Sequence, residues 1–542
     1  MLADLPILSL ITFSPLLGLL VVLFLPKHRS RWIKVTAITA TLLPLLLSLW
    51  LYADYDSVKG GKAYEETATW ISTSLDKTAV GEVGSYTLQF QYHMGVDGLS
   101  MPLLLLTTIV GTMAALASVH IKKRWKSFYI WFLLLEVGMI GVFLARDVFL
   151  FFVFFEMTLI PMFFLIGIWG YMNREQAANK FLLYNGIGSA IMLLAFVLLV
   201  ATAGFRADLQ PNEQQTHLTF SGSYEVISSN LADKDAYVNM PQLSQGSDNP
   251  LYMSDRMHWV IFLLLLIAFG IKLPVFPFHT WMLKVHAEAP PSVVMIHSGV
   301  LLKMGAYGLL RFGVFMFPDV TKDWATALAI LGVVNILYGA VLALVQEEFK
   351  LVLAYSSISH MGIVLLGIAS LNEVGLHGAI IQLVSHGFIS ALLFLIVGSI
   401  YERTGSTELR HLGGLARSMP FLSGVLLAAG MASLGLPGLS GFVGEFLSLL
   451  GLFDSMRAIT AIAVVGVILT AIYVLRSVLG ITFGAIPERF AAVRDVRLVE
   501  AVPMIALLAF IVLIGIYPAV LTDPMRHGFD ALLHQLSDKA GG

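Results

Sequence analysis

The sequence predicts an all-α membrane protein of about fourteen transmembrane helices, with two inverted five-helix repeats that each contain a broken helix. Of its 542 residues, 57% are hydrophobic and 13% are charged, against about 25% charged residues in ordinary soluble domains. Apolar runs of about 20 residues recur along the chain, which is the length that a helix needs to cross a bilayer. Two of the runs are interrupted by proline or glycine beside a charged residue, which indicates the broken helices.

The apolar runs define fourteen candidate spans, all expected to be helical because a lipid-exposed backbone must satisfy its own hydrogen bonds. They lie near residues 5–25, 34–52, 99–118, 127–145, 147–170, 178–202, 258–281, 291–312, 325–345, 350–370, 376–399, 421–450, 456–480 and 500–521. The mean hydropathy of the chain, +0.83, agrees with this density of apolar runs.

The spans divide the chain into four expected units. The units are an N-terminal group of three helices (1–126), a first half-channel (127–312), a second half-channel (325–480) and a C-terminal helix with its tail (481–542). Each half-channel contains five spans, but the two begin on opposite faces of the membrane. The breaks are expected near 272–277 and 435–445, and matching breaks in oppositely oriented halves are typical of inverted-repeat transporters.

Basic clusters follow the first, third, eleventh and thirteenth spans and predict the cytoplasmic face. They comprise Lys27, Arg29, Arg31, Lys34, Lys122, Lys123, Arg124, Lys126, Arg403, Arg410, Arg417, Arg489, Arg494 and Arg497. All of them fall on one face if the spans alternate from an N-terminus outside. The two long loops, 53–98 and 203–257, fall on the other face. The positive-inside rule therefore predicts an even number of spans, with both termini on the non-cytoplasmic side.

The composition argues against several kinds of site. The chain has no cysteine, which excludes disulfides, thiolate nucleophiles and cysteine-ligated iron–sulfur clusters within it. It has no GxGxxG turn between a strand and a helix, and no Walker loop. Its net charge is −2, so no basic face suggests nucleic acid. We therefore expect a chain surrounded by lipid, with no cofactor and no metal of its own.

Seven ionisable side chains within the spans are the candidate functional residues. They are Glu136, Glu156, Lys272, Lys303, His360, His386 and Glu445. A charge at the centre of a span costs about 3 kcal/mol, so the five carboxylates and lysines would together cost about 15 kcal/mol if unpaired. Intramembrane charges usually line the paths of protons or ions. A cost of this size therefore indicates transport.

The stretch "AFGIKLPVFPFH" at 268–279 places Lys272 beside the first expected break. Pro274 lacks an N–H group and clashes with the carbonyl one turn back, so the helix should end near Ile271. The freed carbonyls form the negative end of a half-helix, which favours an ammonium group at that point. Irregular backbone at this depth is tolerated only beside protein or a water-filled cavity. Lys272 is therefore a candidate proton carrier.

Structural roles are the alternative for some of these side chains. Glu156 and Lys272 would then be a buried pair that holds two helices together, and His360 would be a hydrogen-bond partner between helices. His386 shares its span with Gln382 and Ser385, which favours a polar path there. Glu136 is too short to reach the membrane interface, which favours a functional role.

Five motifs resemble the proton-pumping, antiporter-type subunits of respiratory complex I, and the similarity is closest to their M-type branch. The motifs are "FFEMTLIPMFFLIGIWG", "KLPVFPFHTW", "HSGVLLKMGAYGLLRF", "AYSSISHMG" and "GFVGEF" within residues 95–480. Glutamate at position 445 matches the M type, because related subunits usually carry lysine there. The chain departs from the family after "HTW", at residues 282–286, which we expect at a cytoplasmic loop.

The resemblance implies roles for the candidate residues. Glu156 and Lys272 would be the charged pair of the first half-channel, Lys303 the central relay, His386 the relay of the second half and Glu445 the terminal carboxylate. The resemblance also implies a subunit of NADH:quinone oxidoreductase in the bacterial cytoplasmic membrane, beside neighbouring antiporter-like subunits. NADH, FMN, iron–sulfur clusters and quinone would all be bound by those partners. The alternatives are a subunit of a multi-subunit sodium–proton antiporter, and a purely structural membrane anchor that leaves the buried charges unexplained.

Overall fold

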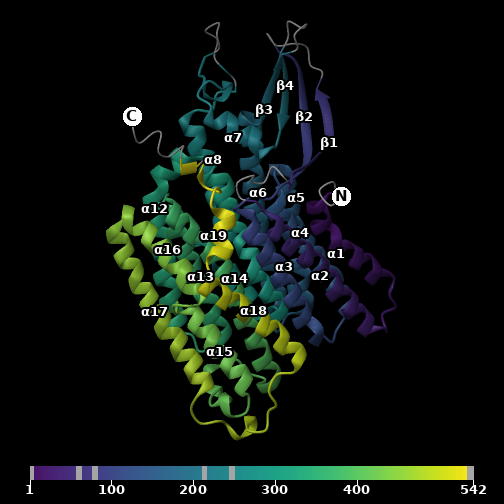
Figure 1. Cartoon of the computed structure of the whole chain (residues 1–542), viewed down its shortest axis with the longest axis vertical. Coiled ribbons are helices and arrows are strands. Elements are labelled where there is room, and N and C mark those ends of the chain that lie inside the picture. The colour runs from purple at the N-terminus through teal and green to yellow at the C-terminus, as the bar shows by residue number, and fades with distance from the viewer. Residues whose placement is uncertain are drawn as a thin grey trace.

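The computed structural model describes residues 5–56, 64–75, 83–209, 216–242, 249, 251–530 and 532–533. Figure 1 shows them as a large helical bundle with a small sheet at one end. The first helices are α1 (Ile7–Phe24), α2 (Ser30–Asp54), α3 (Ser100–Ala117), α4 (Trp125–Leu144), α5 (Val148–Trp169), α6 (Arg174–Ala203), α7 (Tyr224–Ala232), α8 (Asp255–Lys272), α9 (Thr280–Glu288), α10 (Pro291–Ile296) and α11 (Leu302–Gly308). The others are α12 (Pro318–Val345), α13 (Phe349–Ala369), α14 (Glu373–Thr404), α15 (Pro420–Ser433), α16 (Ser440–Ser455), α17 (Arg457–Thr482), α18 (Leu498–Ile516) and α19 (Ala519–Met525).

Twelve helical segments among the described residues are long and apolar enough to cross a membrane. The two other predicted spans are present as interrupted helices, α8–α9 and α15–α16, so both predicted breaks are confirmed. None of these shorter helices counts as a membrane-crossing helix by itself. Helix α8 carries three charged residues, and α15 and α16 have only 14 and 16 residues. The helical membrane fold is therefore confirmed, whereas the count of fourteen spans and the four unit boundaries stay predictions.

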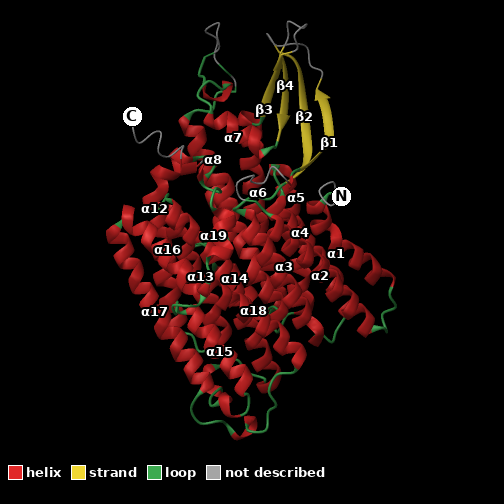
Figure 2. Ribbon diagram, viewed as in Figure 1, coloured by secondary structure: helices red, strands yellow, loops and turns green. Residues whose placement is uncertain are grey.

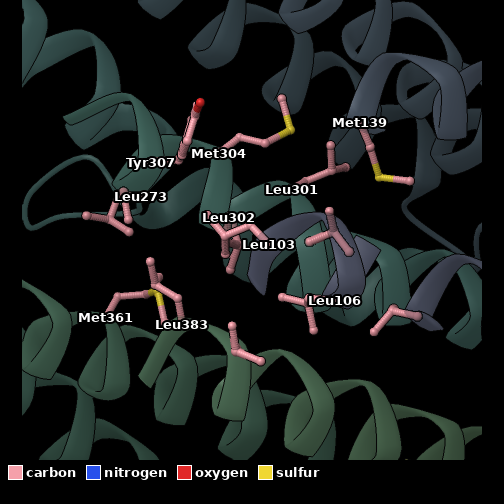
Figure 3. Packing of buried hydrophobic residues seen from close by; sticks show 14 of the residues in the cluster. Leu103, Leu106, Met139, Leu273, Leu301, Leu302, Met304, Tyr307, Met361 and Leu383 are labelled. Carbon is pink, nitrogen blue, oxygen red and sulfur yellow. The ribbon is translucent and has the colours of Figure 1, made fainter. Parts of the chain in front are cut away.

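Two spans form the centre of the bundle and are buried over their whole apolar windows by the rest of the chain. One is the segment Pro291–Val314, which joins α10 and α11 through the π-helical turns η4 (His297–Leu301) and η5 (Leu309–Val314). The other is α14. Figure 3 shows part of the apolar packing at this centre, including Leu302 and Leu383. Polar groups on these two spans are therefore shielded from lipid by protein.

A four-stranded sheet lies at one end of the bundle, within the segments that the sequence analysis treated as loops (Figure 2). Its strands β1 (Glu66–Leu75), β2 (Val83–Met94), β3 (Phe205–Leu209) and β4 (Thr216–Ser221) are arranged in the order β1-β2-β4-β3. The central pair, β2 and β4, is parallel, and both outer pairs are antiparallel. Because β2 and β4 come from different segments, the sheet joins residues 53–98 to residues 203–257.

The sheet end of the bundle also holds the outer ends of the first and last helices. The Glu66 carboxylate at the start of β1 accepts hydrogen bonds from the backbone N–H groups of Leu8, at 2.7 Å, and of Ser9, at 3.1 Å. A carboxylate at a helix N-terminus stabilises the free amides and the helix dipole. Gly98, after β2, packs on the backbone of Pro524 in α19. The start of α1 and the end of α19 therefore lie at the same end of the bundle.

A charge network joins this end of the bundle to the central span. Asp97 accepts from Arg311 of η5, whose guanidinium lies 2.7 Å from its carboxylate, and from Arg146 at 3.1 Å. Burial alone would raise the pKa of Asp97, but the two guanidinium groups hold it well below its usual range. The network therefore stabilises the fold in full above about pH 4, and this contribution is lost only as the pH falls toward the lowered pKa.

Asp97→Asn is expected to destabilise the folded protein by about 3 kcal/mol, because it leaves two arginines without their shared counter-ion. The measurement is the thermal unfolding midpoint of the purified protein in detergent. Asp235→Asn is the matched control, because Asp235 lies on the same end of the molecule and is exposed. Equal midpoints for the two variants would show that the network contributes nothing to stability.

Candidate proton relay

The first predicted group, Glu156 and Lys272, lies between α5 and the end of α8. Lys272 is 2% exposed, and its Nζ lies 4.9 Å from the ring centre of Phe155 and 5.6 Å from that of Phe181. Such cation–π contacts offset part of the desolvation of an ammonium group. Glu156 acts electrostatically on Lys272, but no direct ion pair joins them in the described part of the chain, and Glu156 Oε1 has no hydrogen-bond partner there. The two residues are neighbours, not a contact pair.

The break after Lys272 is held by one side chain from α9 and one from α12. The carbonyl of Ile271 accepts from the indole N–H of Trp281 at 3.0 Å. The backbone N–H of Phe276 donates to Asn335 Oδ1, on α12, at 2.8 Å. These bonds satisfy backbone groups that the interrupted helix cannot satisfy itself. The sequence-based expectation of a break near Ile271 is therefore confirmed, and a residue of the second half helps to fix it.

The helix that carries Lys303 packs directly on this break. A Cβ on Gly305 would lie 2.7 Å from the backbone nitrogen of Leu273, so glycine is required for this approach. Lys303 itself is fully buried on α11, which is flanked by the π-helical turns η4 and η5. Such turns are frequent at functional sites. The local sequence thus brings a buried lysine against the end of α8.

Two histidines that sequence reasoning did not select, His286 on α9 and His297 at the start of η4, form a buried pair. His286 Nε2 lies 2.9 Å from His297 Nδ1, and both side chains are fully buried. Lys303 acts electrostatically on both rings, and Lys272 acts on His297. The pair is therefore electrostatically linked to both lysines.

The position of His286 corrects an expectation from the sequence. Residues 282–286 were expected at a cytoplasmic loop, but Met282, Val285 and His286 are buried. α9 continues the interrupted span inside the bundle, and its His286 contacts His297 of the central span. The exposed Lys284 gave the segment a polar character. A histidine six residues before Lys303 in an apolar run was the available signal for His297.

Lys303 and His386 are in direct contact at the centre of the bundle. Lys303 Nζ lies 2.8 Å from His386 Nδ1 and also donates to the backbone carbonyl of Ser298. The opposite ring nitrogen, Nε2, lies 3.2 Å from Ser357 Oγ on α13. When charged Lys303 donates to Nδ1, the ring proton of the neutral histidine is on Nε2 and faces the serine. His386 therefore joins α11 to α13.

The second half ends in a contact between His360 and Glu445. His360 Nδ1 lies 3.2 Å from Glu445 Oε1 and 3.2 Å from Gln382 Nε2, and the rings of His360 and His386 are 5.3 Å apart. A protonated Nδ1 donates to the carboxylate, whereas a deprotonated Nδ1 accepts from the amide. One nitrogen cannot do both at once, so its protonation state selects the partner.

Glu445 is held close to the second break by the backbone there. Gly435 has φ +79°, and a Cβ on it would lie 2.6 Å from Glu445 Oε2. The other carboxylate oxygen, Oε1, lies 3.2 Å from His360 Nδ1, so Glu445 lies between the second break and His360.

Glu136 stands apart from the other predicted residues. It is fully buried on α4, and neither carboxylate oxygen has a hydrogen-bond partner within the described residues. Its Oε1 lies 3.0 Å from the position that a Cβ on Gly111 of α3 would take. The structure therefore brings together Lys303, His360, His386 and Glu445, places Lys272 near His297 through the shared neighbour Phe181, and leaves Glu136 outside these contacts.

Comparisons with known proteins agree with this architecture. A family model described as "NADH:quinone oxidoreductase/Mrp antiporter, TM" matches residues 145–472. Subunit M of the NADH-quinone oxidoreductase of Rhodobacter capsulatus is 37% identical over 525 residues, which cover 95% of this chain and 94% of that protein. A chain of respiratory complex I from Thermus thermophilus aligns with a TM-score of 0.80 at 28% identity, covering 98% of this chain and 99% of that chain. A chain of the Mrp complex from Dietzia sp. DQ12-45-1b has a TM-score of 0.77 at 21% identity, covering 98% of this chain and 99% of that chain, which shows a shared fold.

Proposed function

This chain belongs to the NADH:quinone oxidoreductase/Mrp antiporter transmembrane family, and on that premise we propose that its buried charges form a path for protons. It is a proton-translocating, M-type membrane subunit of NADH–quinone oxidoreductase, respiratory complex I. It is therefore a multi-pass subunit of a bacterial-type, multi-subunit membrane complex. The roles of the individual residues are the substance of the proposal.

The redox chemistry belongs, in this proposal, to partner subunits. The absence of cysteine in the chain rules out cysteine-ligated clusters in it. We propose that partner subunits hold these clusters and also bind NADH, FMN and quinone. Other membrane-arm subunits, above all neighbouring antiporter-like ones, would flank this chain. Electron transfer in the partners would then drive proton movement through this subunit.

The end of the bundle opposite the sheet would face the cytoplasm, with both termini on the other side. Hydrogen bonds join the basic clusters in two pairs at that end: Trp125 donates to the carbonyl of Lys27, and Arg403 donates to the carbonyl of Arg494. The positive-inside rule places such clusters in the cytoplasm. Figure 1 shows the sheet at the opposite end.

A cavity of about 260 Å³ at this basic end is the proposed entrance for protons. Its lining includes His120, Glu402 and Glu500, and it reaches Ser292 and Gly398 on the two central spans. These side chains offer hydrogen-bond donors and acceptors to water that enters the cavity. The entrance therefore lies on the same two spans that carry Lys303 and His386.

The observation that carries the proposal is the close series of buried side chains from Lys303 through His386 and His360 to Glu445. A proton passed from Lys303 to His386 Nδ1 crosses 2.8 Å, and the ring can then donate its other proton from Nε2 to Ser357 Oγ, 3.2 Å away. The next ring, that of His360, lies 5.3 Å away and contacts Glu445 at 3.2 Å. Each transfer moves a charge beside its neighbour, which changes the neighbour's affinity for a proton. Movement in one direction then depends on the order in which the charges change.

The sodium–proton antiporter alternative has less support. The likeness to the Mrp complex is at 21% identity, whereas the M subunit of Rhodobacter capsulatus is 37% identical over almost the whole chain. A carboxylate paired with a histidine, as in Glu445 and His360, also suits a proton better than a metal cation, because protonated histidine has no free lone pair. A sodium ion at this position would have the carboxylate of Glu445 as its one charged ligand.

Two substitutions in the first half-channel test the proposed function. Glu156→Gln keeps the shape but removes the charge that acts on Lys272, so NADH-driven proton uptake into vesicles is expected to fall by about ten-fold, the effect of about 1.4 kcal/mol. Lys272→Met removes a buried charge and should insert at least as well, yet its proton uptake should also fail.

Assembly of the complex is measured beside proton uptake for both variants. Normal uptake by an assembled Glu156→Gln complex would contradict the relay. Loss of the complex in Lys272→Met, with no separate loss of uptake, would instead support a structural ion pair.

A further inference from the structure

A cluster of metal-ligating side chains lies outside the relay, where the sheet meets the bundle. It consists of Glu65, just before β1, His93 near the end of β2, and Glu225 in the first turn of α7. One ligand atom from each residue lies within 4.8 Å of the other two. Glu65 and His93 belong to residues 53–98 and Glu225 to residues 203–257, which are the two long segments expected outside the cytoplasm. The cluster therefore joins these two extracytoplasmic segments.

His93 distinguishes this cluster from an ordinary group of surface charges. Its side chain is 3% exposed, yet neither ring nitrogen has a hydrogen-bond partner. The nearest carboxylate oxygen, Glu65 Oε2, is 3.9 Å from Nε2, which is too long for a hydrogen bond. Buried polar atoms in folded proteins are nearly always satisfied, and an exception calls for a missing partner. A bound cation would supply a partner for the ring and for both carboxylates.

We propose that Glu65, His93 and Glu225 bind a divalent transition-metal ion of the zinc type, which joins the two extracytoplasmic segments. One imidazole and two carboxylates match the N and O ligands of zinc, with the fourth position left to water. A tetrahedral ion with bonds of about 2.0–2.2 Å needs ligand atoms roughly 3.4 Å apart. The exposed Glu225 side chain provides the closing movement, because it is at the surface end of the cluster.

The charge around the cluster also suits a dication. Two carboxylates face one positive side chain, Arg146, whose guanidinium lies 3.7 Å from Glu65 Oε1. Arg146 keeps its closer contact with Asp97, at 3.1 Å, when Glu65 turns to a metal. The ion would thus lie beside Arg146, which belongs to the charge network of Asp97 and Arg311 on the central span. Metal binding would tie the sheet to the bundle through the same end of that span.

The test uses the purified, chelator-treated complex and zinc chloride. Zinc bound at equilibrium is counted by dialysis for the unmodified protein, for Glu225→Gln and for His93→Gln. The matched control is Glu175→Gln, which removes an exposed carboxylate from the first turn of α6, away from the cluster. Hydrogen–deuterium exchange with and without zinc then locates the ion in this chain, at residues 83–94 and 224–232.

The unmodified complex and Glu175→Gln are expected to bind one zinc ion more than Glu225→Gln, or to bind it at least about ten-fold more tightly. Zinc should slow exchange in both segments of the unmodified protein and in neither segment of Glu225→Gln. Because Glu225 is exposed, its loss leaves the fold intact, so a difference reports on binding. Equal zinc binding by all variants, or exchange that zinc leaves unchanged in both segments, would overturn the proposal.

Discussion

Lys303→Met is expected to lower NADH-driven proton uptake by about 100-fold, the lower end of what a positioned acid–base group contributes. Lys303 is the residue through which the two halves meet, because it contacts His386 directly at 2.8 Å and acts electrostatically on His286 and His297. Methionine has a similar length but neither donates nor accepts the transferred proton. The substitution also removes about 3 kcal/mol of insertion cost, so the complex should assemble.

A second substitution at the same position separates charge from proton transfer. Lys303→Arg keeps a positive charge, but arginine does not lose its proton in proteins. Uptake should therefore stay low in Lys303→Arg if Lys303 carries a proton, and should recover if only its charge matters. Lys284→Met is the matched control, because Lys284 is exposed on the neighbouring α9. Full uptake by an assembled Lys303→Met complex would contradict the central role of this residue.

The first break shows how far the sequence alone reaches. Pro274 acts through local covalent geometry, so the end of α8 could be placed to within one residue. The partners that hold the break are Trp281, ten residues further along in α9, and Asn335 on α12, and no local sequence pattern predicts these hydrogen bonds. The sheet was missed for a different reason. The run "YTLQFQYH" alternates polar and apolar residues with the period of a strand, but it lies between spans and was treated as a loop.

In the candidate site, too, local sequence patterns identified some features, whereas contacts made only in the folded chain could not be predicted. Lys303, His386 and Glu445 were found because a charged or polar group inside an apolar run is costly wherever the run packs. His286 was missed because it was assigned to a loop, and only the fold shows that α9 lies beside the central span. The contact between His360 and Glu445 joins α13 to α16, so the sequence could name both residues but could not pair them. Residue types were predictable, and pairings were not.

Substitutions at Glu445 are the second large effect, since this residue ends the set of contacts. Glu445→Lys is expected to leave the complex assembled and to lower proton uptake by about 100-fold. It replaces the acceptor that faces His360 Nδ1 at 3.2 Å by a donor, so a protonated histidine loses its counter-ion and meets a like charge. Glu445→Asp keeps the charge with a shorter reach and should retain partial uptake.

A double-substitution cycle then asks whether His360 and Glu445 act in one step. His360→Gln and Glu445→Gln should each lower uptake, and the two together should be little worse than either alone, because residues of one unit are not additive. If the loss in the double variant is the product of the two single losses, the residues have independent roles.

The dependence of uptake on sodium distinguishes a proton path from a cation site. If Glu445 bound a cation, uptake by the unmodified protein would depend on sodium concentration. Uptake that is unchanged without sodium, together with a non-additive pair, is the result expected of a proton path that ends at Glu445. Strong sodium dependence, or full uptake by Glu445→Lys, would contradict it.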